Sequence, residues 1–423
     1  MDKVLFEKRL KELKVNCEEQ WATLSYENYV FKNKVTYLEK LQNRRNTNKF
    51  ISTFIKKIKR FPSLEEDKNN WRKEINIDID NFINRFDLFT LEDKNLLLKE
   101  GLLECTEAFI DEAKKFDSSI TFDNIGQGMR NVWIMNIIQL LLGIKVALTP
   151  SVFAYSMLYP YTDNYLDDNN ISYSAKEKIN IRFGKKLQGY DISFENSYEE
   201  KLFSLVEKIE GEFPRESYIG VYESLLAIHR SQWESIKLQN VKNDPNSKDI
   251  LSISIEKGGS SVLADAYLVK GSLTREEENF FFGYGFLLQL CDDLQDGKSD
   301  YANGHLTLIT RNLKVSKLDA ITIKILKLIE LLLIDTSFFK TEHKETIMGL
   351  ISKNCRELIN FAVSHNRRYY NKIFFNKIKI SFFYTPNYMN SVFNKLKNRF
   401  KSLKKSYNGV ATDKILLATF KDD

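Results

Sequence analysis

Proline and glycine are scarce in this chain of 423 residues, which contains only 6 and 17 of them. So few breakers and turn formers disfavour a turn-rich β architecture and favour long, uninterrupted helices. Hydrophobic residues make up 43% of the chain, which is enough for a substantial core. The composition therefore predicts an all-α protein, with room for one large helical domain or two smaller ones.

The chain also lacks paired cysteines and any apolar run long enough to cross a membrane. Its four cysteines have no metal-ligand or redox spacing, which predicts buried or free thiols in a reducing compartment. They are Cys17, Cys105, Cys291 and Cys355. The most apolar stretches, Val132–Leu148 and Leu318–Ile334, are short and carry polar residues, so we expect buried helices. The first residues contain acids and no apolar core, so we expect no signal peptide and a cytoplasmic location.

Acidic residues are absent from one basic segment near the C-terminus. Between Asn366 and Lys405 there are eleven lysines and arginines and no acid, so without them the net charge of +6 becomes −5. The segment suits a solvated helical face, a nucleic acid or an anionic membrane. No nucleic-acid recognition motif accompanies the charges, so no nucleic-acid partner is predicted. Interleaved phenylalanines favour peripheral contact with an anionic membrane through residues 366–405. They are Phe374, Phe375, Phe382, Phe383 and Phe393.

Three regions follow one another along the chain. Residues 1–95 are charged and helical in pattern, and we expect an accessory region. Residues 96–365 contain longer and more apolar helices, and residues 366–423 form the basic helical segment. In the middle region, Thr149-Pro150 predicts the start of a helix that Pro160 would kink. Residues 280–295 predict a second long apolar helix.

Two clusters of aspartates lie in these otherwise apolar helical stretches. The first is Asp163, Asp167 and Asp168, and the second is Asp292, Asp293 and Asp296. Carboxylates in such surroundings are costly unless their charge is compensated. Helix positions i and i+4 share a face, which pairs Asp163 with Asp167 and Asp292 with Asp296. Two such faces opposed across a cavity would form the hard-oxygen site that Mg²⁺ prefers.

All six aspartates are therefore candidate metal ligands, and all except Asp168 are candidate catalytic residues. For both clusters, alternatives without a metal-binding role remain open. The first cluster could be a solvated helix end, since two asparagines follow it. The second could be structural, although the apolar sequence before it makes unpaired carboxylates costly there.

The second cluster belongs to a recognisable motif. Residues 285–296 read Gly-Phe-Leu-Leu-Gln-Leu-Cys-Asp-Asp-Leu-Gln-Asp, which resembles the second aspartate-rich motif of trans-prenyltransferases, with Leu288 in place of Phe. Residues 304–308 resemble the Gly-Lys-x-Thr-Leu that follows in that family, with His305 for Lys. Residues 257–260 resemble its Lys-Thr-Gly/Ala element. The first cluster is similar to the Asp-x-x-x-Asp of squalene and phytoene synthases and to a motif of bacterial terpene synthases. The resemblance to class I isoprenoid synthases spans roughly residues 125 to 370.

This resemblance implies an antiparallel helical bundle around a deep apolar cavity. It implies three Mg²⁺ ions, bound together with the substrate, which neutralise the leaving diphosphate of an allylic prenyl diphosphate. Aromatic faces in the cavity could stabilise the resulting carbocation. The implied substrate-binding residues are Lys257, Arg230, Gln289, Arg311, Arg368 and Tyr369.

Several of these substrate-binding candidates have simpler interpretations. Lys257 could be a surface lysine, and the two glycines that follow it could form a loop. Arg230 could form a helical salt bridge with Glu223 or Glu234. Arg368 could be part of the basic segment alone.

One departure from the family pattern bears on the reaction. Chain-elongating prenyltransferases carry paired arginines soon after the first cluster, whereas here no arginine occurs between Asp168 and Arg182. We therefore expect a terpene synthase or cyclase that acts on a prenyl diphosphate. A prenyltransferase, by elongation or head-to-head coupling, and a non-catalytic isoprenoid-binding protein remain alternatives. The sequence leaves monomer and homodimer open.

Overall fold

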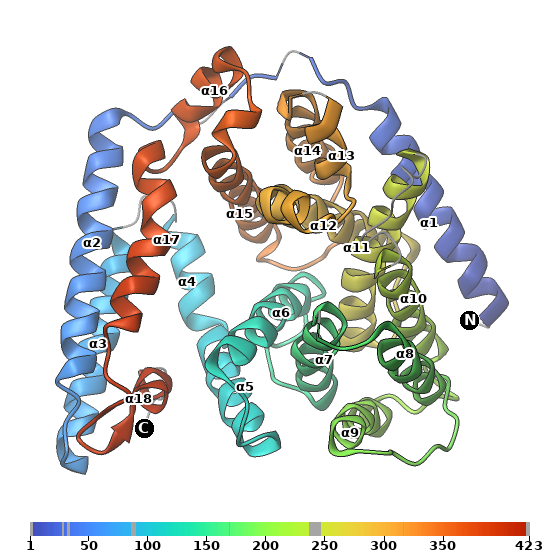
Figure 1. Ribbon diagram of the computed structural model, residues 1–423, viewed down its shortest axis with the longest axis horizontal. Coiled ribbons are helices and arrows are strands. Elements are labelled where there is room, and N and C mark those ends of the chain that lie inside the picture. Colours follow the sequence, from blue (N-terminus) through green and yellow to red (C-terminus); the bar gives the residue numbers. More distant parts are fainter. Residues whose placement is uncertain are drawn as a thin grey trace.

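The computed structural model describes residues 3–27, 29–31, 34–85, 90–168, 170–236, 247–315 and 317–419. Their regular secondary structure is almost entirely helical (Figure 1), which confirms the all-α prediction. The first half contains α1 (Lys3–Thr23), α2 (Tyr37–Lys59), α3 (Glu65–Asn84), α4 (Leu91–Lys99), α5 (Leu102–Phe116), α6 (Phe122–Leu141), α7 (Pro150–Asp167), α8 (Tyr173–Leu187) and α9 (Ser197–Glu212). The second half contains α10 (Ile219–Ile236), α11 (Ser247–Lys270), α12 (Arg275–Asn303), α13 (Leu308–Val315), α14 (Asp319–Leu332), α15 (Lys344–His365), α16 (Lys372–Ile378), α17 (Pro386–Lys401) and α18 (Thr412–Ala418). Short 3₁₀ turns span Arg367–Tyr369 and Lys379–Ser381, and strands β1 (Ser406–Tyr407) and β2 (Val410–Ala411) form an antiparallel hairpin.

The helix ends follow local capping chemistry. Thr149 caps α7 by accepting a hydrogen bond from the Val152 amide, and Pro150 occupies the first turn, as predicted. Thr274 and Glu277 form a capping box at the start of α12. Gly304 ends α12 with φ of 75°, a left-handed conformation that suits glycine. These caps fix the limits of the two helices that carry the aspartate clusters.

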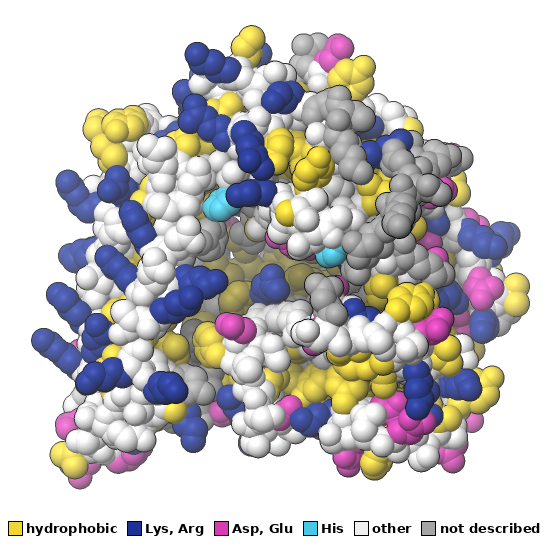
Figure 2. All heavy atoms as spheres, viewed as in Figure 1, with side chains coloured by type: hydrophobic (Ala, Val, Ile, Leu, Met, Phe, Trp, Pro, Cys, Tyr) yellow, Lys and Arg dark blue, Asp and Glu magenta, His cyan; other side chains and the backbone are white. Residues whose placement is uncertain are grey.

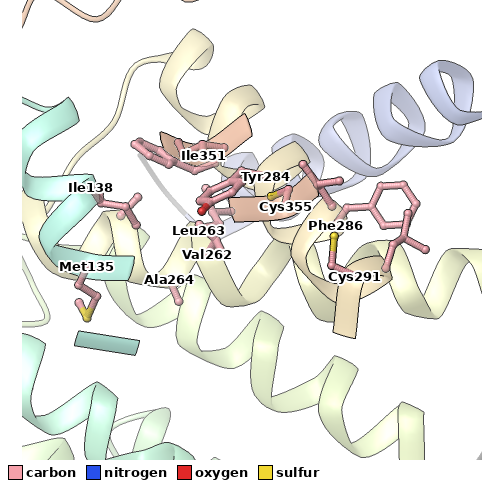
Figure 3. Packing of buried hydrophobic residues seen from close by; sticks show 14 of the residues in the cluster. Met135, Ile138, Val262, Leu263, Ala264, Tyr284, Phe286, Cys291, Ile351 and Cys355 are labelled. Atoms are coloured by element: carbon pink, nitrogen blue, oxygen red, sulfur yellow. The ribbon is translucent and has the colours of Figure 1, made fainter. Parts of the chain in front are cut away.

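The main core surrounds α11 and α12, which pack against each other and against α10, α15, α6 and α7. Figure 3 shows side chains from these helices meeting in one cluster, including Met135, Leu263, Tyr284 and Ile351. All four cysteines are buried and unpaired by disulfides, as expected. The two apolar stretches singled out in the sequence contribute buried residues of α6 and α14. Within the described ranges, no helix is both long and apolar enough to span a bilayer.

Two glycines set the close contact of α11 and α12. A Cβ atom on Gly258 would lie 2.5 Å from the Gly285 carbonyl oxygen, and a Cβ on Gly285 would lie 2.0 Å from the Gly258 oxygen. Both distances are far below van der Waals contact, so the two helices can touch only because these positions lack side chains. The pair Gly258-Gly259 therefore lies inside α11, where it serves packing, and the loop interpretation of these glycines is wrong.

The helices of residues 1–95 divide between two clusters. Helix α1 belongs to the main core through residues such as Phe6 and Trp21, and a buried ion pair of 2.6 Å joins Arg9 to Glu278 of α12. Helices α2 and α3 instead share a small second cluster with α18, which includes Ile58, Trp71 and Ile415. The amphipathic pattern of each helix predicts a buried face but not its partner, so the sequence could not separate α1 from α2.

The basic C-terminal segment is packed on the rest of the protein. Its phenylalanines at 374, 375, 382 and 383 are at most 8% exposed. The expectation that these aromatic side chains contact lipid is therefore wrong, because they fill the core while the basic residues beside them face outward. Hydrogen bonds also join this segment to α2, from Asn43 Nδ2 to the Phe383 oxygen at 3.1 Å and between Thr47 and Tyr384 at 2.8 Å.

Candidate functional site

The C-terminal half of α7 and the middle of α12 bring the two aspartate clusters to one site. An inner cavity of about 170 Å³ is lined by Asp163 of α7, Asp292 of α12 and Lys257 of α11. An adjoining outer cavity of about 230 Å³ is lined by residues of both clusters. They are Asp167, Asp292, Asp293 and Asp296. Because Lys257, Gln289 and Asp292 line both cavities, the two spaces meet at these three side chains.

Away from the aspartates, the inner cavity is lined mainly by apolar and aromatic side chains. They are Leu158, Phe183, Leu187, Leu225, Ile228, Tyr155 and Tyr159. His229 also lines this cavity and packs edge-on against Phe183, with ring centres 5.5 Å apart. Burial and the neighbouring Arg230 charge lower the pKa of His229 to about 4, so its imidazole is neutral near pH 7. Gly184 makes room for it, because a Cβ there would lie 2.8 Å from Nε2.

On the α7 side, Asp163 is the innermost carboxylate. Burial raises its pKa from 3.8 to about 6, with Lys257 opposing the shift and Asp167 contributing to it. The side-chain amide of Gln232 in α10 donates a hydrogen bond to Asp163 Oδ1. Because this pKa lies below 7, Asp163 is largely ionised near pH 7, and the lysine and the amide that face it favour its charged form.

On the α12 side, Asp293 has the most unusual surroundings. Gln289 Nε2 donates a hydrogen bond of 2.8 Å to its Oδ1, whereas its buried Oδ2 has no hydrogen-bond partner among the described residues. Burial, assisted by Asp292 and opposed by Gln289 and Lys257, raises its pKa from 3.8 to about 7. Burial and Asp292 also raise the pKa of Asp296 to about 6. Because the carboxylates of α12 share one region, burial and their mutual repulsion together raise the pKa values of Asp293 and Asp296, and the repulsion favours a cation beside them.

Lys257 lies between the two walls. Its charge lowers the pKa of Asp163 on α7 and of Asp293 on α12, so its ammonium group acts on both clusters. Its place next to Gly258 explains this position, because Gly258 packs directly against Gly285 and Gln289 of α12. The surface-lysine alternative does not describe this side chain, which lines both cavities.

The structure does not bring every predicted residue to the site. Asp168 ends α7 and accepts hydrogen bonds from the backbone and side chain of Asn170, at 2.8 and 2.9 Å. Arg230 is exposed and lies outside both linings, while its neighbour His229 lies inside. Arg311 in α13 is also absent from the two linings.

Arg368 and Tyr369 are likewise outside both cavities. Arg368 is exposed, and its guanidinium lies 4.5 Å from the ring centre of Tyr369. The Tyr369 carbonyl accepts a hydrogen bond of 3.0 Å from the Leu318 amide. These contacts match the simpler interpretation of Arg368 as part of the basic segment.

Three residues of the site were not predicted. Asp300 lines the outer cavity one helical turn beyond Asp296, and its helical spacing from Asp292 and Asp296 could have revealed it. It lies 3.4 Å from His305 Nδ1. Gln232 and His229 come from α10, whose sequence carries no motif, so only the fold could place them.

The carboxylates of the site line open space, but they do not form a closed metal-binding cage. Among the residues that the structure describes, no three His, Cys, Asp or Glu side chains converge closely enough to hold an ion alone. Comparison of the chain with models of known protein families, with curated proteins and with solved structures gives no match. What the site does must therefore be inferred from its own chemistry.

Proposed function

We propose that the protein is a Mg²⁺-dependent class I isoprenoid synthase of the terpene synthase type. It would ionise an allylic prenyl diphosphate to a carbocation and release diphosphate. The single observation that carries this proposal is the meeting of the two aspartate clusters with Lys257 where the outer cavity adjoins an inner cavity with apolar and aromatic walls. A prenyl diphosphate matches both parts of the site. Its anionic head group suits metal ions held by the aspartates together with Lys257, and its hydrocarbon chain suits the apolar walls.

The carboxylates fit Mg²⁺ as the resident ion. Mg²⁺ is usually held by one or two carboxylates, with water and substrate phosphate completing its shell, so a cage of three protein ligands is not required. Asp163, Asp167, Asp292, Asp293 and Asp296 would hold the ions, and the unpaired Oδ2 of Asp293 is an oxygen that needs such a partner. When bound, the ions supply neutralisation of the leaving diphosphate.

The protein's own residues would divide the remaining work. The Lys257 ammonium, which lies on α11 between the aspartates of α7 and α12, would bind the diphosphate. Gln232 and Gln289 orient Asp163 and Asp293 through their side-chain amides. The apolar walls would exclude water from the hydrocarbon, and the faces of Tyr155 and Tyr159 would stabilise positive charge.

One observation favours cyclisation or elimination over coupling of two prenyl units. The first arginine after the α7 cluster is Arg182, and its guanidinium is already bound to Glu199 at 2.7 and 2.9 Å and to the Ser193 oxygen at 2.6 Å. It is therefore not poised to bind a second diphosphate. Prenyl coupling and simple isoprenoid binding are the competing outcomes of the test below.

The test is incubation with allylic prenyl diphosphates of increasing chain length, with and without Mg²⁺, followed by assay of diphosphate and mass analysis of products. A terpene synthase would release diphosphate from one of them alone, only with Mg²⁺. Dependence on isopentenyl diphosphate would instead identify chain elongation. Binding without release by a folded, Mg²⁺-loaded protein would identify a non-catalytic binder.

A further inference from the structure

The C-terminal basic segment is not the only acid-free stretch of the chain. Residues 40–64 contain eight lysines and arginines and no acid, and residues 366–405 contain eleven and no acid. Since the whole chain carries +6, the residues outside these two stretches carry −13. The protein therefore concentrates its positive charge in two segments that are more than 300 residues apart in sequence.

The fold joins these two stretches into one surface. Helices α2 and α17 lie side by side (Figure 1), and Tyr388 Oη donates a hydrogen bond of 3.1 Å to Asn48 Oδ1. Arg44 of α2 and Lys395 of α17 lie over the same Tyr388 ring, 5.6 and 5.4 Å from its centre. The two charges thus meet at the seam between the helices.

The charges of this joint surface are available. All eleven basic residues of 366–405 are exposed, and so are Arg45, Lys49, Lys56, Lys59 and Arg60. None of these exposed side chains forms an ion pair with an acidic residue in the described ranges. Figure 2 shows the resulting concentration of Lys and Arg side chains over α2, α17 and α16. We call this set the basic surface.

Exposed apolar side chains accompany the basic surface. Leu38 and Leu41 of α2 are 77% and 36% exposed, and they lie on the same helical stripe as Arg45 and Lys49. Ile373 of α16 is 73% exposed. The chain that follows α16 meets the start of α2, where the Val35 amide donates a hydrogen bond of 2.9 Å to the Ile380 oxygen. The sugar-phosphate backbone of a nucleic acid has no apolar site for such side chains, whereas a membrane interface accommodates them between lipid head groups.

We propose that the basic surface, built jointly by α2 and residues 366–405, docks the protein onto anionic phospholipid membranes. The lysines and arginines would supply the attraction to the lipid phosphates, and Leu38 with Ile373 would enter the interface. This inference does not depend on the proposed catalytic function.

The test measures binding of the full chain to vesicles of phosphatidylcholine with and without phosphatidylserine. The first variant, Arg45→Glu/Lys49→Glu/Lys56→Glu, changes α2, and the second, Lys397→Glu/Lys401→Glu/Lys404→Glu, changes the C-terminal segment. The matched control is Lys11→Glu/Lys145→Glu/Lys185→Glu, whose three lysines are exposed outside the basic surface. All three variants alter the net charge equally, and their exposed positions should leave the melting temperature unchanged.

We expect the parent protein to bind only the anionic vesicles, with affinity that falls steeply as salt is raised. Each of the first two variants should bind at least about tenfold more weakly, while the control should bind like the parent. Leu38→Asn should weaken vesicle binding but leave binding to a short DNA duplex unchanged. If only the C-terminal variant loses vesicle binding, α2 does not contribute and the proposed joint surface is wrong. Failure of the parent to bind anionic vesicles at low salt, or preference for DNA, would overturn the membrane proposal.

Discussion

Asp293 is the residue whose surroundings say most about the site. One of its oxygens accepts a hydrogen bond from Gln289 and the other is buried without a partner among the described residues. A buried carboxylate oxygen usually has a hydrogen-bond partner, so an unpaired one calls for an explanation. A bound ligand would supply the missing partner. The free energy that the unpaired oxygen costs the ligand-free protein can be measured.

We predict that Asp293→Asn stabilises the Mg²⁺-free protein at pH 8. The pKa of Asp293 is raised from 3.8 to about 7 by burial, so the contribution of its proton to stability is fully present below pH 3.8 and is lost as pH rises through 7. Asparagine has no proton to lose, so thermal unfolding at pH 5 and pH 8 should show a smaller decline in the variant. Each unit of pKa shift is worth about 1.4 kcal/mol, so the gain at pH 8 should not exceed a few kcal/mol.

The same variant should lose diphosphate release by about 100-fold or more, since a charge that stabilises the transition state is removed. Loss of stability at pH 8 together with loss of activity would instead give Asp293 a structural role.

At Lys257 we expect a change in ligand binding rather than in folding. Lys257→Ala removes the ammonium group between the two aspartate walls, and inorganic diphosphate should then inhibit about tenfold less strongly, the equivalent of one charge-assisted hydrogen bond. The inhibition constant of diphosphate is the measurement. Lys185→Ala, on an exposed face of α8, is the matched control. Equal inhibition of parent and Lys257 variant would remove this lysine from the site.

Among the secondary-structure elements, the contact of α11 with α12 positions the site. We predict that Gly258→Ala costs about 1–3 kcal/mol of unfolding free energy through overpacking, and that it lowers activity by moving Lys257 away from Asp292. Gly349→Ala is the control, because a Cβ there meets nothing within 4 Å. Alanine in that helix should stabilise by about 0.5–1 kcal/mol. Urea unfolding compares the two, and equal effects would contradict the packing role of Gly258.

The elements also show what the sequence could predict and what it could not. The start of α7 and the body of α12 followed from a cap, a proline and apolar periodicity, all of which are local signals. The aspartates of both helices are also predicted from local signals, namely their spacing of four residues within apolar helices and the motif of residues 285–296. The sequence does not predict Gln232 and His229, because their role depends on α10 packing against α8 and on Gln232 bonding Asp163 of α7, which no local pattern encodes. Arg230 was the candidate instead, one position away on the exposed face.

For the whole molecule, the packing of the C-terminal segment makes a further prediction. Removal of residues 366–423 would expose core side chains that contact Phe374, Phe375, Phe382 and Phe383, each worth about 2 kcal/mol or more when buried. Since whole proteins are stable by only about 5–15 kcal/mol, the truncated chain should unfold at much lower urea or not fold. A truncated chain with unchanged unfolding would mean that this segment is not part of the core.

The central claim is that the aspartates of α7 and α12 form one metal-dependent diphosphate site. Its most direct measurement is calorimetric titration of the protein with inorganic diphosphate in Mg²⁺, using Asp163→Asn, Asp292→Asn and the double variant. We predict Mg²⁺-dependent binding by the parent and at least about tenfold weaker binding by each single variant. In the double variant the combined loss should be smaller than the sum, because both walls hold the same ligand. Binding that needs no Mg²⁺, or that ignores either aspartate, would contradict the claim.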